Sequence, residues 1–248
     1  MLPRRIGASV GLSAMIGLLG WRRRALAPSG VAGAVVVGTA VHLAGGWRWS
    51  TVLLSFFGTS SALSRLRKSG AKLESGHEIE ARGSQRDLVQ ALSNGGVATA
   101  VAVMQMARPS SRLEAAFAGS FAAANADTWA TEIGKTSGSR PRLITTGALA
   151  PTGTSGAVTL RGLLAAAAGS SVITAVDVAT SSAAGKARRA AGMSAAGFFG
   201  ALVDSLVGAT IQASYYCPSC DKPTERKIHG CGTPTRLESG FAWCNNDV

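Results

Sequence analysis

Residues 122–134 read AAANADTWATEIG, an alanine-rich apolar run that contains Asn125, Asp127 and Glu132 within eight residues. If this run lies in a lipid bilayer, its carboxylates are costly there, and an ionisable group inside a membrane usually faces a partner or a hydrated cavity. The interpretation of fold and function therefore depends on whether the segments around this run cross a membrane.

The composition favours a membrane protein. Only 15% of the 248 residues are charged, the mean hydropathy is +0.22, and glycine alone contributes 31 residues. Small residues suit bilayer helices because they allow close backbone approach, whereas a soluble core needs larger side chains to fill it. We expect an all-α, polytopic bundle of six or seven transmembrane helices, with residues 1–248 forming a single integral membrane domain.

The net charge of +12 could indicate a nucleic-acid partner. The charges, however, stand in short runs between apolar segments: RRR at 22–24, RLRK at 65–68 and KARR at 186–189. Such runs are typical of membrane topology and of contact with anionic headgroups. The expected partner is therefore the lipid bilayer, and no nucleic acid is expected.

Seven apolar segments are candidate spans, and the N-terminal one ends in WRRR rather than in a small-residue cleavage site, so it is interpreted as a helix and not as an export signal. They are Ile6–Trp21, Gly30–Trp47, Ser50–Leu63, Leu88–Met106, Leu113–Asp127, Leu160–Ala179 and Met193–Ala213. If all seven cross, most lysines and arginines fall on the side of residues 22–24, 65–86, 135–161 and the C-terminal tail. The positive-inside rule then predicts a multi-pass cell-membrane protein with these loops in the cytoplasm and the N-terminus outside.

The last candidate span contains GFFGALVDSLVGATIQ, residues 197–212, with one charge at Asp204. Steps of four place Gly200, Asp204, Gly208 and Gln212 on one helical face. The glycines leave room for a helix or a ligand to approach the carboxylate. A functional intramembrane carboxylate and a packing face with a hydrogen-bonded Asp204 are both compatible with this pattern.

The fourth span has a similar stripe at its cytoplasmic entrance. Arg82, Arg86, Gln90 and Asn94 fall at steps of four, from charged to amide. Arginine suits bidentate phosphate binding, although an interfacial arginine with a snorkelling stem gives the same pattern.

The opening run reaches the cytoplasmic face near Asp127, and if its helix persists, Asp127, Thr131 and Lys135 share one side. The loop that follows, SGSRPRLITTGALAPTGTSG at 137–156, contains Arg142 and many glycines and hydroxyls. Its backbone amides and arginines could bind phosphate oxygens, although it has no Walker spacing. Carboxylates for Mg²⁺ and cations for phosphates are the groups that phosphoryl transfer requires.

The residues from 214 to 248 are expected to form a cysteine-containing cytoplasmic tail within this domain. Cys217 and Cys220 form a CxxC pair, and His229 and Cys231 follow. These four side chains could close a structural zinc site; a disulfide and unligated cysteines are the alternatives.

Five of these segments together resemble a known family. They are RGSQRDLVQALSNGG (82–96), GSFAAANADTWATEIG (119–134), PRLITTGALAPTGTSGAVTLRG (141–162), GALVDSLVGATIQ (200–212) and NND (245–247). The sequence resembles the integral membrane proteins grouped as domain of unknown function 92, or transmembrane-protein-19-like, from about Arg82 to its end. Family members usually continue past NND into another apolar helix, whereas this sequence ends at Val248, so either the protein is short or the sequence is a fragment.

The resemblance implies an activity. Plant members include phytyl-phosphate kinase, which converts a prenyl monophosphate to the diphosphate, and the family is distantly similar to CTP-using dolichol and phytol kinases. We therefore expect a lipid kinase that uses CTP or ATP, with an isoprenoid lipid substrate and Mg²⁺. The candidate catalytic residues are Asp127, Glu132 and Asp204; the candidate Mg²⁺ ligands are Asp127, Asp204 and Asp247; the candidate phosphate-binding residues are Arg86, Gln90, Asn94, Lys135, Arg142 and Gln212.

Two other classes of function fit the same residues. A transporter or channel would use Asp204 as a proton or cation site. A membrane scaffold would use the cysteine-containing tail to recruit a partner.

Overall fold

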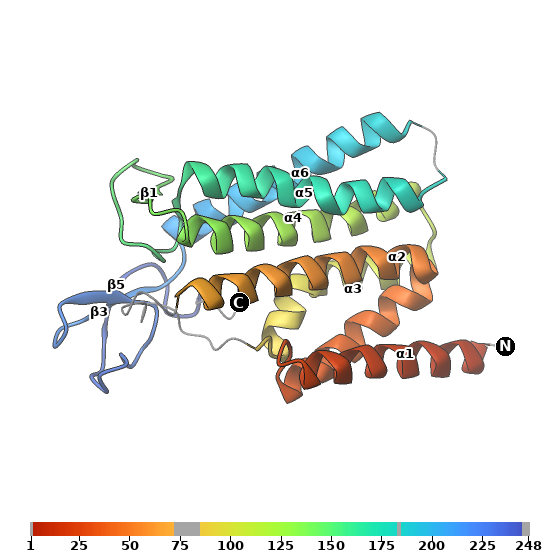
Figure 1. Cartoon of the computed structure of the whole chain (residues 1–248), viewed down its shortest axis with the longest axis horizontal. Helices are drawn as coiled ribbons and strands as arrows, with labels where there is room; N and C mark the ends of the chain where they lie inside the picture. Colours follow the sequence, from red (N-terminus) through yellow and green to blue (C-terminus); the bar gives the residue numbers. More distant parts are fainter. Residues whose placement is uncertain (1, 72–84, 183–184, 245–248) are drawn as a thin grey trace.

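The computed structural model describes residues 2–71, 85–182 and 185–244, which form six helices and five short strands (Figure 1). The helices are α1 (Leu2–Arg22), α2 (Pro28–Ala71), α3 (Leu88–Ala107), α4 (Ser111–Lys135), α5 (Leu160–Thr180) and α6 (Lys186–Thr210). The strands are β1 (Arg142–Leu143), β2 (Ala157–Val158), β3 (Ser214–Cys217), β4 (Lys222–Thr224) and β5 (Arg236–Ser239). The expected helical bundle is confirmed.

Helix α2 contains two of the expected spans. It begins at Pro28, whose fixed φ suits the first turn of a helix, and it is broken at Gly46, where φ is 57° and ψ is −147°. Glycine adopts this conformation without a steric cost. The chain reverses direction there, so the two halves of α2 run in opposite directions (Figure 1).

Three helical segments in the described ranges are long and apolar enough to cross a bilayer, as judged from length and composition. They are Pro28–Arg67, Leu160–Thr180 and Lys186–Thr210. Large apolar side chains, including Val97, Leu164 and Phe199, are more than half exposed on the outside of the bundle. Such an apolar outer surface is what a lipid-facing bundle requires.

Helix α4 occupies the centre and contacts α2, α3, α5 and α6. Its Phe117 ring stacks on Trp49 of α2 with centroids 3.8 Å apart, and its Phe121 contacts Phe56 of α2. Asn125, which is fully buried, donates to the Gly169 carbonyl of α5 at 2.8 Å. The polar side chain of Asn125 thus stabilises the contact between α4 and α5 and is a structural residue.

Buried charges connect the helices at the bundle end that is remote from the strands. Asp177 of α5 has no exposed surface, and its two carboxylate oxygens accept from Arg48 at 3.2 Å and from Arg189 at 3.1 Å. Arg48 also pairs with Glu114 at 2.8 Å. The sequence analysis did not anticipate this network, which joins α2, α4, α5 and α6.

The strands lie at the other end of the helices (Figure 1). β1 and β2 form an antiparallel pair within the loop between α4 and α5, while β3, β4 and β5 form an antiparallel sheet in the order β4-β3-β5. The sequence analysis expected a tail after residue 214 but no sheet. Each of these strands has only two to four residues, too few to show an alternating pattern.

Candidate functional site

A polar cavity of about 570 Å³ lies at the strand end of the bundle, between α2, α3, α4, α5, α6 and residues 152–159. Eight of the residues singled out from the sequence line it: Arg86, Gln90, Asn94, Asp127, Glu132, Lys135, Asp204 and Gln212. They come from three helices and the segments next to them. The structure therefore brings most of the candidate site residues into one cavity.

The centre of the cavity is a pair of carboxyl groups. Asp127 of α4 and Asp204 of α6 are in hydrogen-bond contact through their side chains. Two carboxylates this close repel each other unless a shared proton or a cation lies between them. The pair is therefore suited to hold either one.

Glycines on α6 allow this approach. A Cβ at Gly200 would lie 2.8 Å from the Ala123 Cβ of α4, and one at Gly208 would lie 3.1 Å from the Gly156 backbone nitrogen. Larger side chains would push α6 away from α4 and from the loop. The sequence expectation that these glycines let neighbours approach Asp204 agrees with this geometry.

Glu132 lies five residues beyond Asp127 on α4 but has different contacts. It accepts a hydrogen bond from the Ser64 hydroxyl at 2.6 Å and pairs with Arg67 Nε at 2.5 Å, both from α2. The carboxylate thus has two protein partners and holds Arg67 at the cavity wall. Glu132 is better explained as a positioning residue than as a catalytic one.

The stripe expected on the fourth span is present only in part. Helix α3 begins at Leu88 after Asp87, whose carboxylate accepts from the Gln90 backbone in a capping box. Arg86 therefore precedes the helix instead of lying on its face, and Arg82 lies outside the described residues. Gln90 and Asn94 are on α3, where the Asn94 amide donates to the Gln90 carbonyl at 2.9 Å.

Arg86 reaches the cavity through tertiary contacts. Its backbone N–H donates to Ala25 and its carbonyl accepts from Ala27, which fixes it beside the α1–α2 turn. Its guanidinium carbon lies 5.4 Å from the Phe56 ring centroid and 5.9 Å from that of Phe57. Stacking of this kind orients the planar donor fork of arginine.

Helix α4 persists to Lys135, so Asp127, Thr131 and Lys135 all line the cavity. The opposite wall is the PTGTSG segment, 151–156, of which residues 152–156 line the cavity with their hydroxyls and backbone. Gly156 has φ of 72° and lies directly against Ala209 of α6. Backbone and hydroxyl groups in this arrangement are suited to phosphate oxygens.

Gln212 follows the end of α6 and also lines the cavity. Its Nε2 is buried, and it has no hydrogen-bond partner among the residues that the structure describes. A buried amide donor without a partner is costly, so it points to a ligand or a water molecule in the cavity.

Two candidates are not placed at this site. Arg142 is exposed in β1, does not line the cavity, and donates to the Gly147 carbonyl at 2.8 Å. The expectation that Arg142 binds phosphate is therefore not supported by its position. Asp247 lies outside the described residues.

The residues of the cavity wall that the sequence analysis missed include Ser64, Arg67 and Glu225. Arg67 belongs to the RLRK run that was interpreted only as a topology signal. Glu225 accepts a hydrogen bond from the Ser155 hydroxyl at 2.5 Å, which connects β4 to the PTGTSG segment. The partners in these contacts are 65 or more positions apart in the chain, and helical spacing in the sequence cannot predict contacts of that kind.

A second, apolar cavity of about 100 Å³ adjoins the polar one. Its walls come mainly from α1, α2 and α3, and include Leu12, Val37, Leu54 and Phe57. Arg86, Gln90 and Asn94 line both cavities. An apolar cavity thus meets a polar one at a boundary of one guanidinium and two amides.

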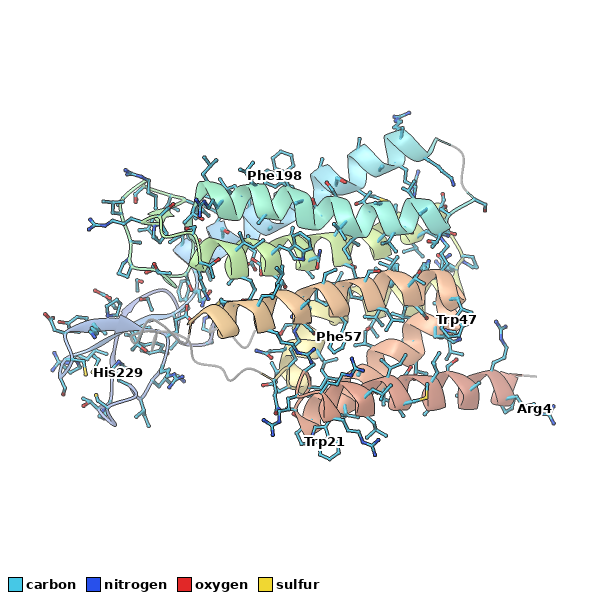
Figure 2. The ribbon with its side chains drawn as sticks, in the orientation of Figure 1. Arg4, Trp21, Trp47, Phe57, Phe198 and His229 are labelled. Carbon is cyan, nitrogen blue, oxygen red and sulfur yellow. The ribbon has the colours of Figure 1, made fainter. Side chains whose placement is uncertain are left out.

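The cysteine and histidine side chains of the tail form a separate cluster. The ligand atoms of Cys217, Cys220, His229 and Cys231 all lie within 4.8 Å of one another. Hydrogen bonding with Thr233 and then His229 lowers the pKa of the Cys231 thiol to about 6, while hydrogen bonding with Cys231 raises the pKa of Cys220 to about 11. Figure 2 shows His229 beyond the end of the helices, in the sheet region.

A model of the integral membrane protein family DUF92 matches residues 11–248. The chain belongs to this family. The resemblance found in the sequence is thereby confirmed, and the protein is an integral membrane protein.

Relatives of this DUF92 protein come from distant organisms. Protein PGR of Arabidopsis thaliana is 35% identical over 262 residues, which cover 91% of this chain and 88% of the plant protein. An uncharacterized membrane protein of Methanocaldococcus jannaschii is 30% identical over 208 residues, with 84% of each chain covered. One from Synechocystis is 32% identical over 146 residues, or 58% of this chain and 56% of the relative. No solved structure matches.

Proposed function

We propose that this DUF92 protein phosphorylates an isoprenoid monophosphate to the diphosphate, with CTP or ATP as the donor. One observation carries the proposal: the polar cavity with the Asp127–Asp204 pair continues into an apolar cavity through Arg86, Gln90 and Asn94. A ligand with a charged head and a hydrocarbon tail matches both chambers and the boundary between them.

The boundary residues are suited to the lipid phosphate. The Arg86 guanidinium, held against Phe56 and Phe57, is oriented for a bidentate contact with phosphate oxygens. The isoprenoid chain would then extend along the apolar walls between α1, α2 and α3. The nucleotide triphosphate would occupy the wider part of the polar cavity, near Lys135 and residues 152–156.

The reaction is a direct displacement. An oxygen of the lipid phosphate attacks the γ-phosphorus of the nucleotide, and a new P–O–P linkage forms. The bond between the γ-phosphorus and the β–γ bridging oxygen breaks, and the nucleoside diphosphate leaves. One carboxylate of the Asp127–Asp204 pair accepts the proton when the lipid phosphate arrives singly protonated, and Lys135 stabilises the negative charge on the phosphates. The displacement needs no nucleophile from the protein.

The donor set of this cavity fits magnesium. Mg²⁺ prefers oxygen ligands, typically one or two carboxylates with water and substrate phosphates, and Asp127 and Asp204 present two carboxyl groups in contact. Bound there, magnesium would neutralise charge on the nucleotide phosphates. Asp127 and Asp204 are the residues that would hold it.

The membrane orientation belongs to the same proposal. The strand end of the bundle carries residues 136–159 and 211–244 with their lysines and arginines, and α1 begins at the opposite end, where Figure 2 shows Arg4. We place the strand end in the cytoplasm, where nucleotide is available, and the start of α1 outside.

A transfer assay tests the proposal. The purified protein is given CTP or ATP labelled at the γ-phosphate, together with phytyl, geranylgeranyl or undecaprenyl phosphate, and the lipid fraction is analysed for labelled diphosphate. We expect label in at least one lipid diphosphate, its loss in Asp127→Asn, and its retention in Glu114→Gln, a carboxylate variant at the remote end of the bundle. The proposal is wrong if no lipid phosphate is labelled, or if proteoliposomes show ion flux without nucleotide consumption.

A further inference from the structure

We infer that Cys217, Cys220, His229 and Cys231 bind one structural zinc ion, which holds the C-terminal sheet together. This inference is independent of the proposed kinase activity, because it rests on ligand geometry at the end of the bundle. It also differs from the magnesium site, which has oxygen donors only.

The distances fit tetrahedral zinc. With Zn–S bonds of about 2.3 Å, two thiolates on a tetrahedral zinc lie about 3.8 Å apart. The Sγ atoms of Cys217 and Cys231 are 3.7 Å apart, and the Nδ1 atom of His229 lies 3.1 Å from the Cys231 Sγ. All four ligand atoms lie within 4.8 Å of one another, so side-chain shifts of about 1 Å bring every one of them to a single ion. Thiolate and imidazole donors in this number select zinc over hard cations.

The backbone presents these ligands from two tight turns. Cys217 ends β3, and Cys220 stands in the turn to β4. His229 and Cys231 stand in a second turn, closed by the His229 N–H donating to Thr233 and the Gly232 N–H donating to His229. In each turn, the residue after the second ligand has positive φ: Asp221 at 53° and Gly232 at 86°. The two turns thus face each other with their ligands pointing inward.

The sheet has little else to stabilise it. Within the described ranges, the clusters of buried apolar residues lie in the helices, between Val37 and Ala201. In the sheet region, Ile228 is 63% exposed and Leu237 is 47% exposed. Ala213 and Tyr215 are buried there, but a unit of about 30 residues with so few buried apolar side chains usually needs a metal or disulfides. A zinc ion supplies this cross-link by joining four positions.

The site has a structural consequence for the polar cavity. Glu225 follows β4, lines that cavity, and accepts from Ser155 of the PTGTSG segment. Zinc would hold β4 in place and thereby fix Glu225 against the loop.

Metal analysis of the purified full chain tests the inference. We expect about one zinc per chain, less than a fifth of that in Cys217→Ser and in Cys231→Ser, and full occupancy in Cys244→Ser, a cysteine outside the cluster. Cobalt exchanged into the wild-type protein should show thiolate charge-transfer and tetrahedral visible bands. Removal of the metal with a chelator should speed proteolysis between residues 214 and 239.

Two results would overturn the zinc site. One is folded wild-type protein that contains no zinc after purification in zinc-supplemented medium and takes up no cobalt. The other is a disulfide among the four residues, detected by mass spectrometry of non-reduced protein. Because zinc content is measured without turnover, a failure of the kinase proposal leaves this test intact.

Discussion

Replacing Gly156 by alanine should separate the PTGTSG segment from α6. Gly156 has φ of 72°, and a non-glycine residue in this left-handed region costs about 1–2 kcal/mol. An added Cβ would also lie 2.4 Å from the backbone nitrogen and 2.6 Å from the Cα of Ala209. Since both are backbone atoms of α6, a rotamer change cannot relieve the collision, and the loop must move by about 1 Å to reach ordinary contact. Overpacking of this kind adds about 1–3 kcal/mol.

Gly147→Ala is the matched control for Gly156→Ala. Gly147 has φ of 69°, but its added Cβ meets no atom within 4 Å and the residue does not line the cavity. Unfolding in mixed detergent micelles should therefore show Gly156→Ala to be less stable than Gly147→Ala by about 1–3 kcal/mol. Phosphoryl transfer should fall about 100-fold in Gly156→Ala alone, because an ångström of misplacement has that effect. Equal stability of the two variants would refute the contact between this loop and α6.

Three further predictions follow from other contacts. Asp177→Asn leaves Arg48 and Arg189 beside a neutral amide and should lower the free energy of unfolding by about 3–5 kcal/mol. Glu114→Gln, at a partly exposed carboxylate, should lower it by less than about 1 kcal/mol. Similar losses in the two variants would contradict the buried network. The loss of phosphoryl-transfer rate in Glu132→Gln should be at least tenfold smaller than the loss in Asp127→Asn, since Glu132 acts through Arg67. A larger loss in Glu132→Gln would make Glu132 catalytic. Ala34→Phe should fill the apolar cavity and raise KM about tenfold for geranylgeranyl phosphate but not for a short prenyl phosphate. An equal rise in KM for both lipids would mean that the isoprenoid chain does not bind in this cavity.

The helices could be predicted because apolar segments and basic runs mark them locally. Helical periodicity also predicted that Asp127 and Lys135 share a face. The structure agrees, because α4 runs without a break to Lys135. The spacing of Gly200, Asp204 and Gly208 likewise predicted a close approach, because each glycine removes a side chain where a neighbour packs.

Contacts between distant segments could not be predicted in this way. Arg86 reaches the cavity from non-helical backbone that hydrogen-bonds with Ala25 and Ala27. A pattern of helical steps of four therefore could not predict its position. The pairing of Arg67 with Glu132 depends on how α2 packs against α4. Arg142 lies away from the cavity, because its side chain is exposed in a short strand and donates a hydrogen bond to the Gly147 carbonyl of its own loop.

The most direct measurement of the central claim is a double-mutant cycle on the two carboxyl groups. Asp127→Asn, Asp204→Asn and the double variant are compared with the wild-type protein for the rate of γ-phosphate transfer to an isoprenoid monophosphate. If the two groups work as one unit in one cavity, each single variant loses nearly as much rate as the double variant, because the effects of such residues are not additive. Losses that simply multiply, or a wild-type protein that transfers no phosphate, would contradict the account.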